Sequence, residues 1–310
     1  MNMVSNKASI DKLIWRCHKR NPSHDIKINI REGSIFEGFQ IKIPILYFLM
    51  YFCFIENISI NSALIKCNDF CYQVGEGGIT AQSIINFYSV VREKLRAKMH
   101  RQWEKDLIGI KINDNLGYSS IEIDESKIIS SGQEIYWMFD LIDRNTKEAS
   151  IRCVLTDRSK NKLLPIIKKY VNTLDGNEYE ENEDDENVIM NENVSIKTRI
   201  FSGCFRSYHP IDFQNMGFIL KRVNHSVWFG AGILHTNTIE SLWHQIKLIT
   251  NNFAGLNINT IKNKFNNNEL MITNYIDGWI CFSLLIRDFK RLKLKWNDRI
   301  TYLNNYLICN

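Results

Sequence analysis

The chain has 310 residues and a formal net charge of +5, with 45% apolar and 24% charged residues. This length can bury an ordinary core and build one large or two modest domains. The longest apolar run, 43–55, is shorter than the roughly 20 residues that a membrane-spanning helix needs. We therefore expect a globular protein with no membrane span and no secretory signal.

Eight cysteines are scattered along the chain, mostly among apolar neighbours, and none belongs to a C-x-x-C pair. This usage is typical of reduced thiols in an intracellular protein. We expect the protein in the nucleus if its source is eukaryotic, and in the cytoplasm otherwise.

The charge is unevenly distributed. Residues 175–193 contain nine acids and no Lys or Arg, so the remainder of the chain carries +14. The acidic stretch has too few apolar residues to fold, which predicts a mobile surface insertion. The basic remainder suits a polyanion such as nucleic acid, although a basic surface that binds nothing has the same composition.

Helical periodicity dominates residues 41–110, with helices expected near 44–55, 60–67 and 80–103. The last of these helices carries Arg92 and Arg96 beside aromatic residues, as a helix that contacts DNA phosphates does. Three such helices could form a helix-turn-helix. A plain three-helix bundle with a solvated basic face fits the pattern equally well.

The periodicity changes at Ser119, and an alternating pattern predicts strands from there on. The strands are expected near 119–124, 134–142, 148–156, 196–201 and 217–223, with helices near 160–172 and 235–251. This order is the ribonuclease-H-like arrangement. We therefore predict an α/β fold, a ribonuclease-H-like mixed sheet with flanking helices, preceded by a small all-helical domain and followed by a helical tail over 253–310.

Two segments carry candidate chemistry. Asp124 ends an apolar, alternating strand, where a carboxylate can hold a divalent metal at a sheet edge. Asn237, Glu240 and Lys247 recur at helical spacing and share one face of the helix near 235–251. An ordinary strand-terminal acid and a solvated helix face would show the same patterns.

Four segments occur together in a characteristic order and spacing. They are Glu122–Lys127, Asp157–Ser159, Val223–Ser226 and His235–Glu240, the last followed by Trp243 and Lys247. Over residues 118–252 the chain resembles the transposase domain of ISXO-type insertion sequences, which is similar to other DDE-type recombinases.

The resemblance implies a site in which two Asp and a third Glu or Asn hold two Mg²⁺ ions for DNA cleavage and strand transfer. Asp124 corresponds to the first metal ligand, and either Glu240 or Asn237 to the third. Lys247, His225 and His235 correspond to positions near DNA. A homo-oligomer, as transposases form, is implied as well.

The chain departs from the family pattern at two places. The second Asp of the family falls on Gly203, which has no side chain to bind metal. The zinc module that relatives often carry is reduced within residues 1–40 to Cys17, His18 and His24, one ligand fewer than a structural zinc site needs, so no zinc is expected. The segment 30–36 of the family pattern is retained.

Three functional readings follow. The chain is an active Mg²⁺-dependent transposase if another acid, which is Asp157, Asp212 or a residue of the acidic insertion, replaces the missing ligand. It is a DNA-binding protein without cleavage activity if no acid does. It is a decaying relic if only the fold persists. The loss of a metal ligand favours the second reading.

Overall fold

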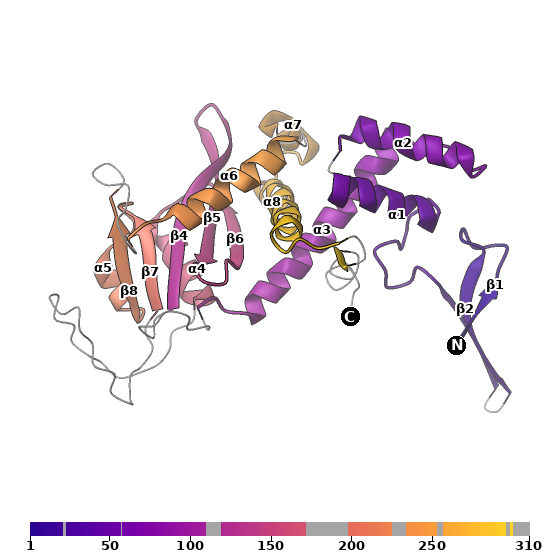
Figure 1. The fold of residues 1–310 in the computed structure, drawn as a ribbon, viewed down its shortest axis with the longest axis horizontal. Helices are drawn as coiled ribbons and strands as arrows, with labels where there is room; N and C mark the ends of the chain where they lie inside the picture. Colours follow the sequence, from indigo (N-terminus) through magenta and orange to yellow (C-terminus); the bar gives the residue numbers. More distant parts are fainter. Residues whose placement is uncertain are drawn as a thin grey trace. The chain divides into compact units, whose positions relative to one another are not determined.

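The computed structural model describes residues 1–20, 23–56, 58–109, 119–171, 198–224, 234–252, 257–295 and 298–299. The predicted acidic insertion and His225 lie outside these residues. The chain divides into two compact units (Figure 1). The first unit holds Met1–Met99 and Cys281–Asn310, and the second holds His100–Ile280.

The first unit begins with a three-stranded antiparallel sheet that the sequence analysis did not predict. Its strands are β1 (Asn2–Ser5), β2 (Leu13–Arg20) and β3 (Ser23–Asn29), in the order β1-β2-β3. In β2 the Cys17 side chain contacts His24 of β3, with 3.1 Å between Sγ and Nε2. His18 faces Asp25 in the strand register.

The segment 30–36 has a structural role in the first unit. Arg31 is buried and forms a bidentate ion pair with Asp11, at 2.5 and 2.6 Å, and donates to the carbonyl of Phe39. Asp11 also accepts a hydrogen bond from the backbone N–H of Ile43, at the start of the first helix. The hydrogen bond from Arg31 lowers the pKa of Asp11. This pair therefore ties the N-terminal sheet to the helices that follow.

Helices follow where the periodicity predicts them. They are α1 (Ile43–Tyr51), the π-helical turn η1 (Phe52–Glu56), α2 (Ile60–Gln73) and α3 (Ala81–Lys105). Pro44 lies in the first turn of α1, where its missing N–H costs nothing. The helical region begins at the predicted place, and the small antiparallel sheet lies within residues 1–40, which the sequence analysis described as a reduced zinc module.

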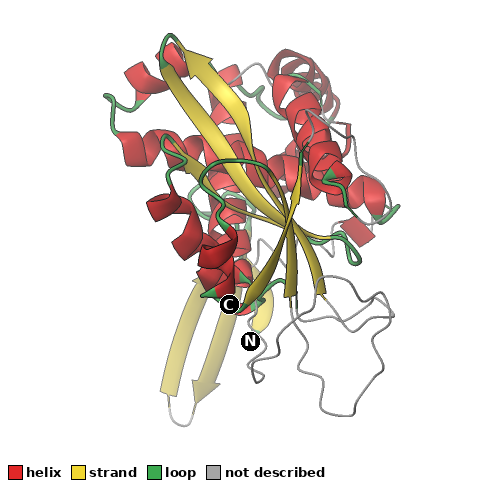
Figure 2. Cartoon of the chain, turned by 90° about the vertical axis from the view of Figure 1, so that its left-hand side faces the viewer, coloured by secondary structure: helices red, strands yellow, loops and turns green. Residues whose placement is uncertain are grey.

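The second unit contains a five-stranded mixed sheet. Its strands are β4 (Ser119–Ser131), β5 (Glu134–Asp143), β6 (Ala149–Leu155), β7 (Thr198–Gly203) and β8 (Phe218–Val223). Their order in the sheet is β6-β5-β4-β7-β8. The three strands β4, β5 and β6 are antiparallel, whereas β7 pairs parallel to β4 and β8 parallel to β7. All five predicted strands therefore belong to one mixed sheet, whose twist is visible in Figure 2.

The two faces of this sheet differ in chemistry. Ile121 and Ile123 point to one face, where they join an apolar core with Leu163 and Ile167 of α4 (Lys160–Tyr170). The residues that alternate with them, Glu122 and Asp124, point to the opposite face. That face is covered by α6 (Asn237–Asn252), which crosses the sheet on the side away from α4 (Figure 1). The short helix α5 (Pro210–Gln214) adds the buried Phe213 to the apolar core.

The predicted helical tail contains α7 (Ile258–Lys264) and α8 (Glu269–Arg291). Among the described helices, α8 is long and apolar enough to cross a membrane by length and composition, a property that the sequence analysis did not identify. Within its most apolar window 67% of the residues are buried, as in the core helix of a globular protein.

Candidate functional site

The candidate site lies where α6 packs along β4, and three polar contacts join the two elements. Ile239, Trp243 and Lys247 of α6 donate to Glu122, Asp124 and Ser126 of β4, respectively. Four helical residues advance by about 6 Å and two strand residues by about 6.6 Å, so the two spacings match. This match fixes the position of α6 on the strand that carries Asp124.

Glu122 is the buried anchor of this arrangement. Its side chain is 0% exposed and pairs with Arg144, at 2.8 Å from Nε to Oε1. Its Oε2 accepts a hydrogen bond of 2.8 Å from the backbone N–H of Ile239, in the first turn of α6. A carboxylate at a helix N-terminus satisfies an amide that lacks an intrahelical partner and is favoured by the helix dipole. The carboxylate of Glu122 therefore holds α6 in place. Because both of its oxygens already have partners within the protein, this carboxylate is unsuited to metal binding.

His235 belongs to the same cluster. Its Nδ1 lies 3.5 Å from Oε1 of Glu122, and its carbonyl accepts a hydrogen bond from Arg144. Burial and then the charge of Arg144 lower the pKa of His235 from its ordinary value of 6.5. A lowered pKa favours the neutral ring, so this partly exposed histidine contributes more to the anchor than to an anion-binding surface.

Asp124 lies one step further along β4 and is held by α6. The indole Nε1–H of Trp243 donates to its Oδ2 at 3.1 Å. Lys247 donates to Ser126 at 2.7 Å, and burial lowers its pKa whereas the charge of Asp124 raises it. Lys247 therefore lies near Asp124, the first metal-ligand position, a proximity that the sequence analysis did not predict.

The two candidates for the third ligand lie on the exposed side of α6. Glu240 and Asn237 are both exposed. The hydroxyl of Thr236 donates to Oε1 of Glu240 at 2.9 Å. The face that meets β4 is formed instead by Ile239, Trp243 and Lys247.

Gly203 lies beside Asp124 at the end of β7. The parallel register pairs Ile123 with Ser202, so Asp124 and Gly203 are the next positions on adjacent strands. A Cβ built on Gly203 meets no atom within 4 Å, and its backbone is not in the left-handed region. The position therefore has room for a side chain, and neither packing nor backbone conformation requires glycine there.

The acids near Asp124 do not complete a metal site. Asp140 faces Asp124 directly in the register of β5 and is 0% exposed, with its Oδ1 accepting a hydrogen bond from the N–H of Leu141. Within the described ranges, no group of three His, Cys, Asp or Glu ligands includes Asp124, Asp140 or Glu240. Mg²⁺ is bound by several oxygen ligands in octahedral geometry. The carboxylates present therefore do not fit a two-metal centre.

The replacement acids that the sequence suggested are committed elsewhere. Asp157 accepts two hydrogen bonds from Ser159, and Asp212 pairs with Lys160 at 2.6 Å. Neither contact lies on the α6 side of the sheet. Glu122, Arg144 and Asp140 were missed as members of the cluster; the only available signal was a second acid two residues before Asp124.

The basic residues of α3 are used within the first unit. Arg92 is 7% exposed, and its Nη2 donates to Ser89 at 3.2 Å. Arg96 pairs with Glu93 at 2.7 Å, and Lys94 donates to the carbonyl of Ser34 at 3.1 Å. Burial argues against direct contact between Arg92 and phosphates, and the pairing of Arg96 weakens the same expectation for that residue.

The comparisons with known proteins assign no family. No protein-family model matches the chain, and no curated protein matches it. The resemblance to ISXO-type transposases therefore stays a prediction that depends on the residues quoted above.

Proposed function

We propose that this chain is a DNA-binding protein built on a ribonuclease-H-like, transposase-type domain whose metal centre is incomplete. The observation that carries the proposal is the juxtaposition of Asp124 with Gly203 on adjacent parallel strands, next to the helix that holds Asp124. DDE-type recombinases need a second carboxylate at that place. Without it, two Mg²⁺ ions cannot clamp the attacking and leaving oxygens of a phosphodiester.

The sheet topology supports the family assignment. Three antiparallel strands followed by two parallel ones, in the order β6-β5-β4-β7-β8, make the arrangement that the predicted element order calls for. Helix α6, which follows the last strand of the sheet in the chain, packs on the central strand β4. Fold alone does not establish function, so the proposal depends on the site residues.

The charge distribution supports a polyanionic ligand. The chain outside the acidic stretch carries +14. Contacts between Lys or Arg and phosphates release bound counterions, so binding of this kind weakens steeply with salt. Salt dependence is therefore the diagnostic property of the proposed binding.

Two assays on the full chain test the proposal. The first assay measures binding to a duplex of about 30 base pairs by fluorescence anisotropy, at salt concentrations from about 50 to 200 mM. If six or more phosphates are contacted, the affinity should fall by a factor of about 10³ or more over this range. Incubation of supercoiled plasmid with Mg²⁺ should produce no more nicked circles than incubation with a chelator. Absence of duplex binding at the lowest salt would refute the proposal.

A second function has one observation in its favour. Asp140 faces Asp124 across β4 and β5, and two carboxylates on adjacent strands could share a single divalent ion. A weak Mg²⁺-dependent nuclease would follow. Nicking by the unmodified chain that is lost in both Asp124→Ala and Asp140→Asn would identify this alternative.

A further inference from the structure

A pocket of about 630 Å³ opens on the second unit, away from the contact between α6 and β4. It is lined by the turn and first residues of β5, by the start of α4 and by the segment that follows β7. Its charged lining consists of Arg158, Lys160, Arg206 and one acid, Asp157. Lys160 pairs with Asp212 at 2.6 Å, which leaves Arg158 and Arg206 against Asp157, so the lining is net positive.

Arg158 is held rigidly in this pocket by two aromatic rings. Its guanidinium carbon lies 3.5 Å from the ring centre of Trp137 and 4.6 Å from that of Phe205. The side chain is 29% exposed, and its nearest acid, Glu125, is 3.7 Å away, beyond hydrogen-bonding distance. A guanidinium stacked in this way keeps its N–H edge available, and it is preorganised for bidentate binding of a phosphate.

The start of α4 contributes a second feature that favours an anion. The hydroxyl of Ser159, the N-cap residue, donates to Asp157 at 2.7 Å and makes no cap hydrogen bond to the helix. The first turn of α4 contains no acid, so the positive end of an 11-residue helix adjoins the pocket. Within the described part of the chain, no side chain pairs with the exposed Arg206.

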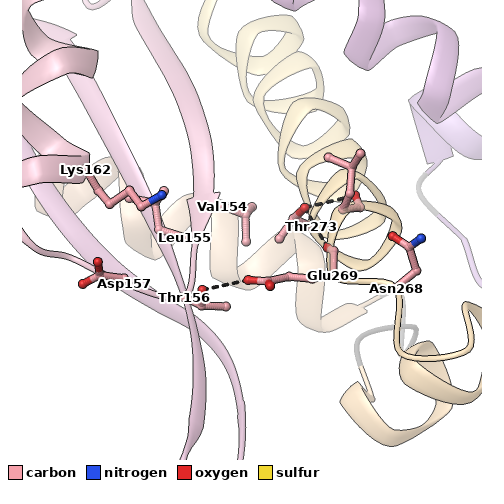
Figure 3. A pocket seen from close by; sticks show the side chains of 9 residues that line it. Val154, Leu155, Thr156, Asp157, Lys162, Asn268, Glu269 and Thr273 are labelled. Atoms are coloured by element: carbon pink, nitrogen blue, oxygen red, sulfur yellow. Dashed lines mark hydrogen bonds between the residues drawn. The ribbon is translucent and has the colours of Figure 1, made fainter.

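A neighbouring hollow offers a contrast. It also measures about 630 Å³ and lies between the end of β6 and the start of α8 (Figure 3). Its charged lining is Asp157, Lys162 and Glu269, and Thr156 donates to Glu269 at 2.9 Å across it. Two acids and one cation make this lining net negative. An anion therefore has a preferred place in the pocket that contains Arg158.

We propose that the pocket formed around Arg158, Arg206 and the start of α4 binds a phosphate group of a nucleic-acid strand. The recognised group is the phosphate, because a guanidinium pairs with phosphate oxygens through its N–H groups. The strand as the source of that phosphate rests on the proposed function. The pocket adjoins the strand that carries the candidate site, because Glu125, which lies 3.7 Å from Arg158, directly follows Asp124 on β4.

The test compares two charge-matched variants of the full chain. Arg206→Gln removes an exposed cation from the pocket, and Arg222→Gln removes an exposed cation from β8 outside it. The probe is a fluorescent single strand of about 12 nucleotides, the 12-mer, and its anisotropy is measured across a salt series. We expect Arg206→Gln to weaken binding at least threefold and to reduce the slope of log K against log salt by about 0.7, the contribution of one phosphate contact on a single strand.

Arg158→Gln should weaken binding of the 12-mer further, and its circular dichroism spectrum shows whether the fold persists. Equal losses in Arg206→Gln and Arg222→Gln, or no loss in Arg206→Gln, would overturn the proposal. Duplex binding that persists while Arg206→Gln has no effect would reject the pocket but keep the proposed function. A competition assay compares a free mononucleotide with an unlabelled 12-mer at equal phosphate concentration. If both displace the labelled 12-mer equally well, the ligand is a small phosphate compound, and the strand is rejected as the source.

Discussion

The buried pair Glu122–Arg144 should be the most costly contact to break in the second unit. Arg144→Met removes the cation beside a carboxylate that is 0% exposed, and the side chain of Arg144 is itself 10% exposed. Loss of one partner from a buried pair leaves an uncompensated charge and costs about 3–5 kcal/mol. The hydrogen bond from Arg144 to the carbonyl of His235 and its contact with the Phe201 ring, at 3.4 Å, are lost as well.

Hydrogen exchange at the start of α6 reads this loss directly, because the N–H of Ile239 donates to Glu122. A loss of 3 kcal/mol would speed exchange there by about 100-fold if local opening governs it, since each 1.4 kcal/mol is a factor of about ten. The double variant Glu122→Gln with Arg144→Met should recover part of the loss, because no charge then remains buried. If the exchange rate of this amide in Arg144→Met stays within about threefold of the wild-type rate, the pair is not the anchor of α6.

Three further changes should alter stability in defined ways. Trp243→Phe removes the donor to Asp124 and should cost about 1.5–3 kcal/mol in urea unfolding, the range for a hydrogen bond to a charged group; an unchanged midpoint would contradict this. Burial, with the nearby charge of Asp124, raises the pKa of Glu125 from 4.5 to about 8. The melting temperature of the wild type should therefore fall as pH rises from 4.5 to 8, and Glu125→Gln should reduce this pH dependence. The hydrogen bond from Arg31 lowers the pKa of Asp11 from 3.8, so its contribution is present above pH 3.8 and is lost as pH falls through the folded value; Asp11→Asn should lower the melting temperature at neutral pH and reduce the acid-induced loss.

The large sheet could be predicted from sequence because its strands are long and their pattern is strong. Ile121 and Ile123 alternate with Glu122 and Asp124, and the two isoleucines face the apolar core. The N-terminal sheet was not predicted, although Ile26 and Ile28 of β3 alternate with charged and polar residues, which is a strand pattern. No residue of β3 is buried, so this alternation does not mark a strand that faces a core.

The site was predictable only in part. Helical spacing grouped Lys247 with Glu240 and Asn237, but in the structure Lys247 contacts Ser126 of β4, whereas Glu240 and Asn237 are exposed. Helical spacing marks a broad stripe of residues and does not show which edge of that stripe meets the sheet. The role of Arg144 depends on a contact with Glu122 across 22 positions of the chain, which no local pattern encodes.

Plasmid nicking by Gly203→Asp tests the central claim most directly, because the position has room for the side chain and an ordinary backbone conformation. We expect no Mg²⁺-dependent nicking by the wild type and measurable nicking by Gly203→Asp. Gly203→Asn, similar in size but without the charge, should remain inactive, and so should Gly203→Asp combined with Asp124→Ala. Nicking by the wild type at the rate of Gly203→Asp would contradict the account, because the metal centre would then be complete without a carboxylate at residue 203.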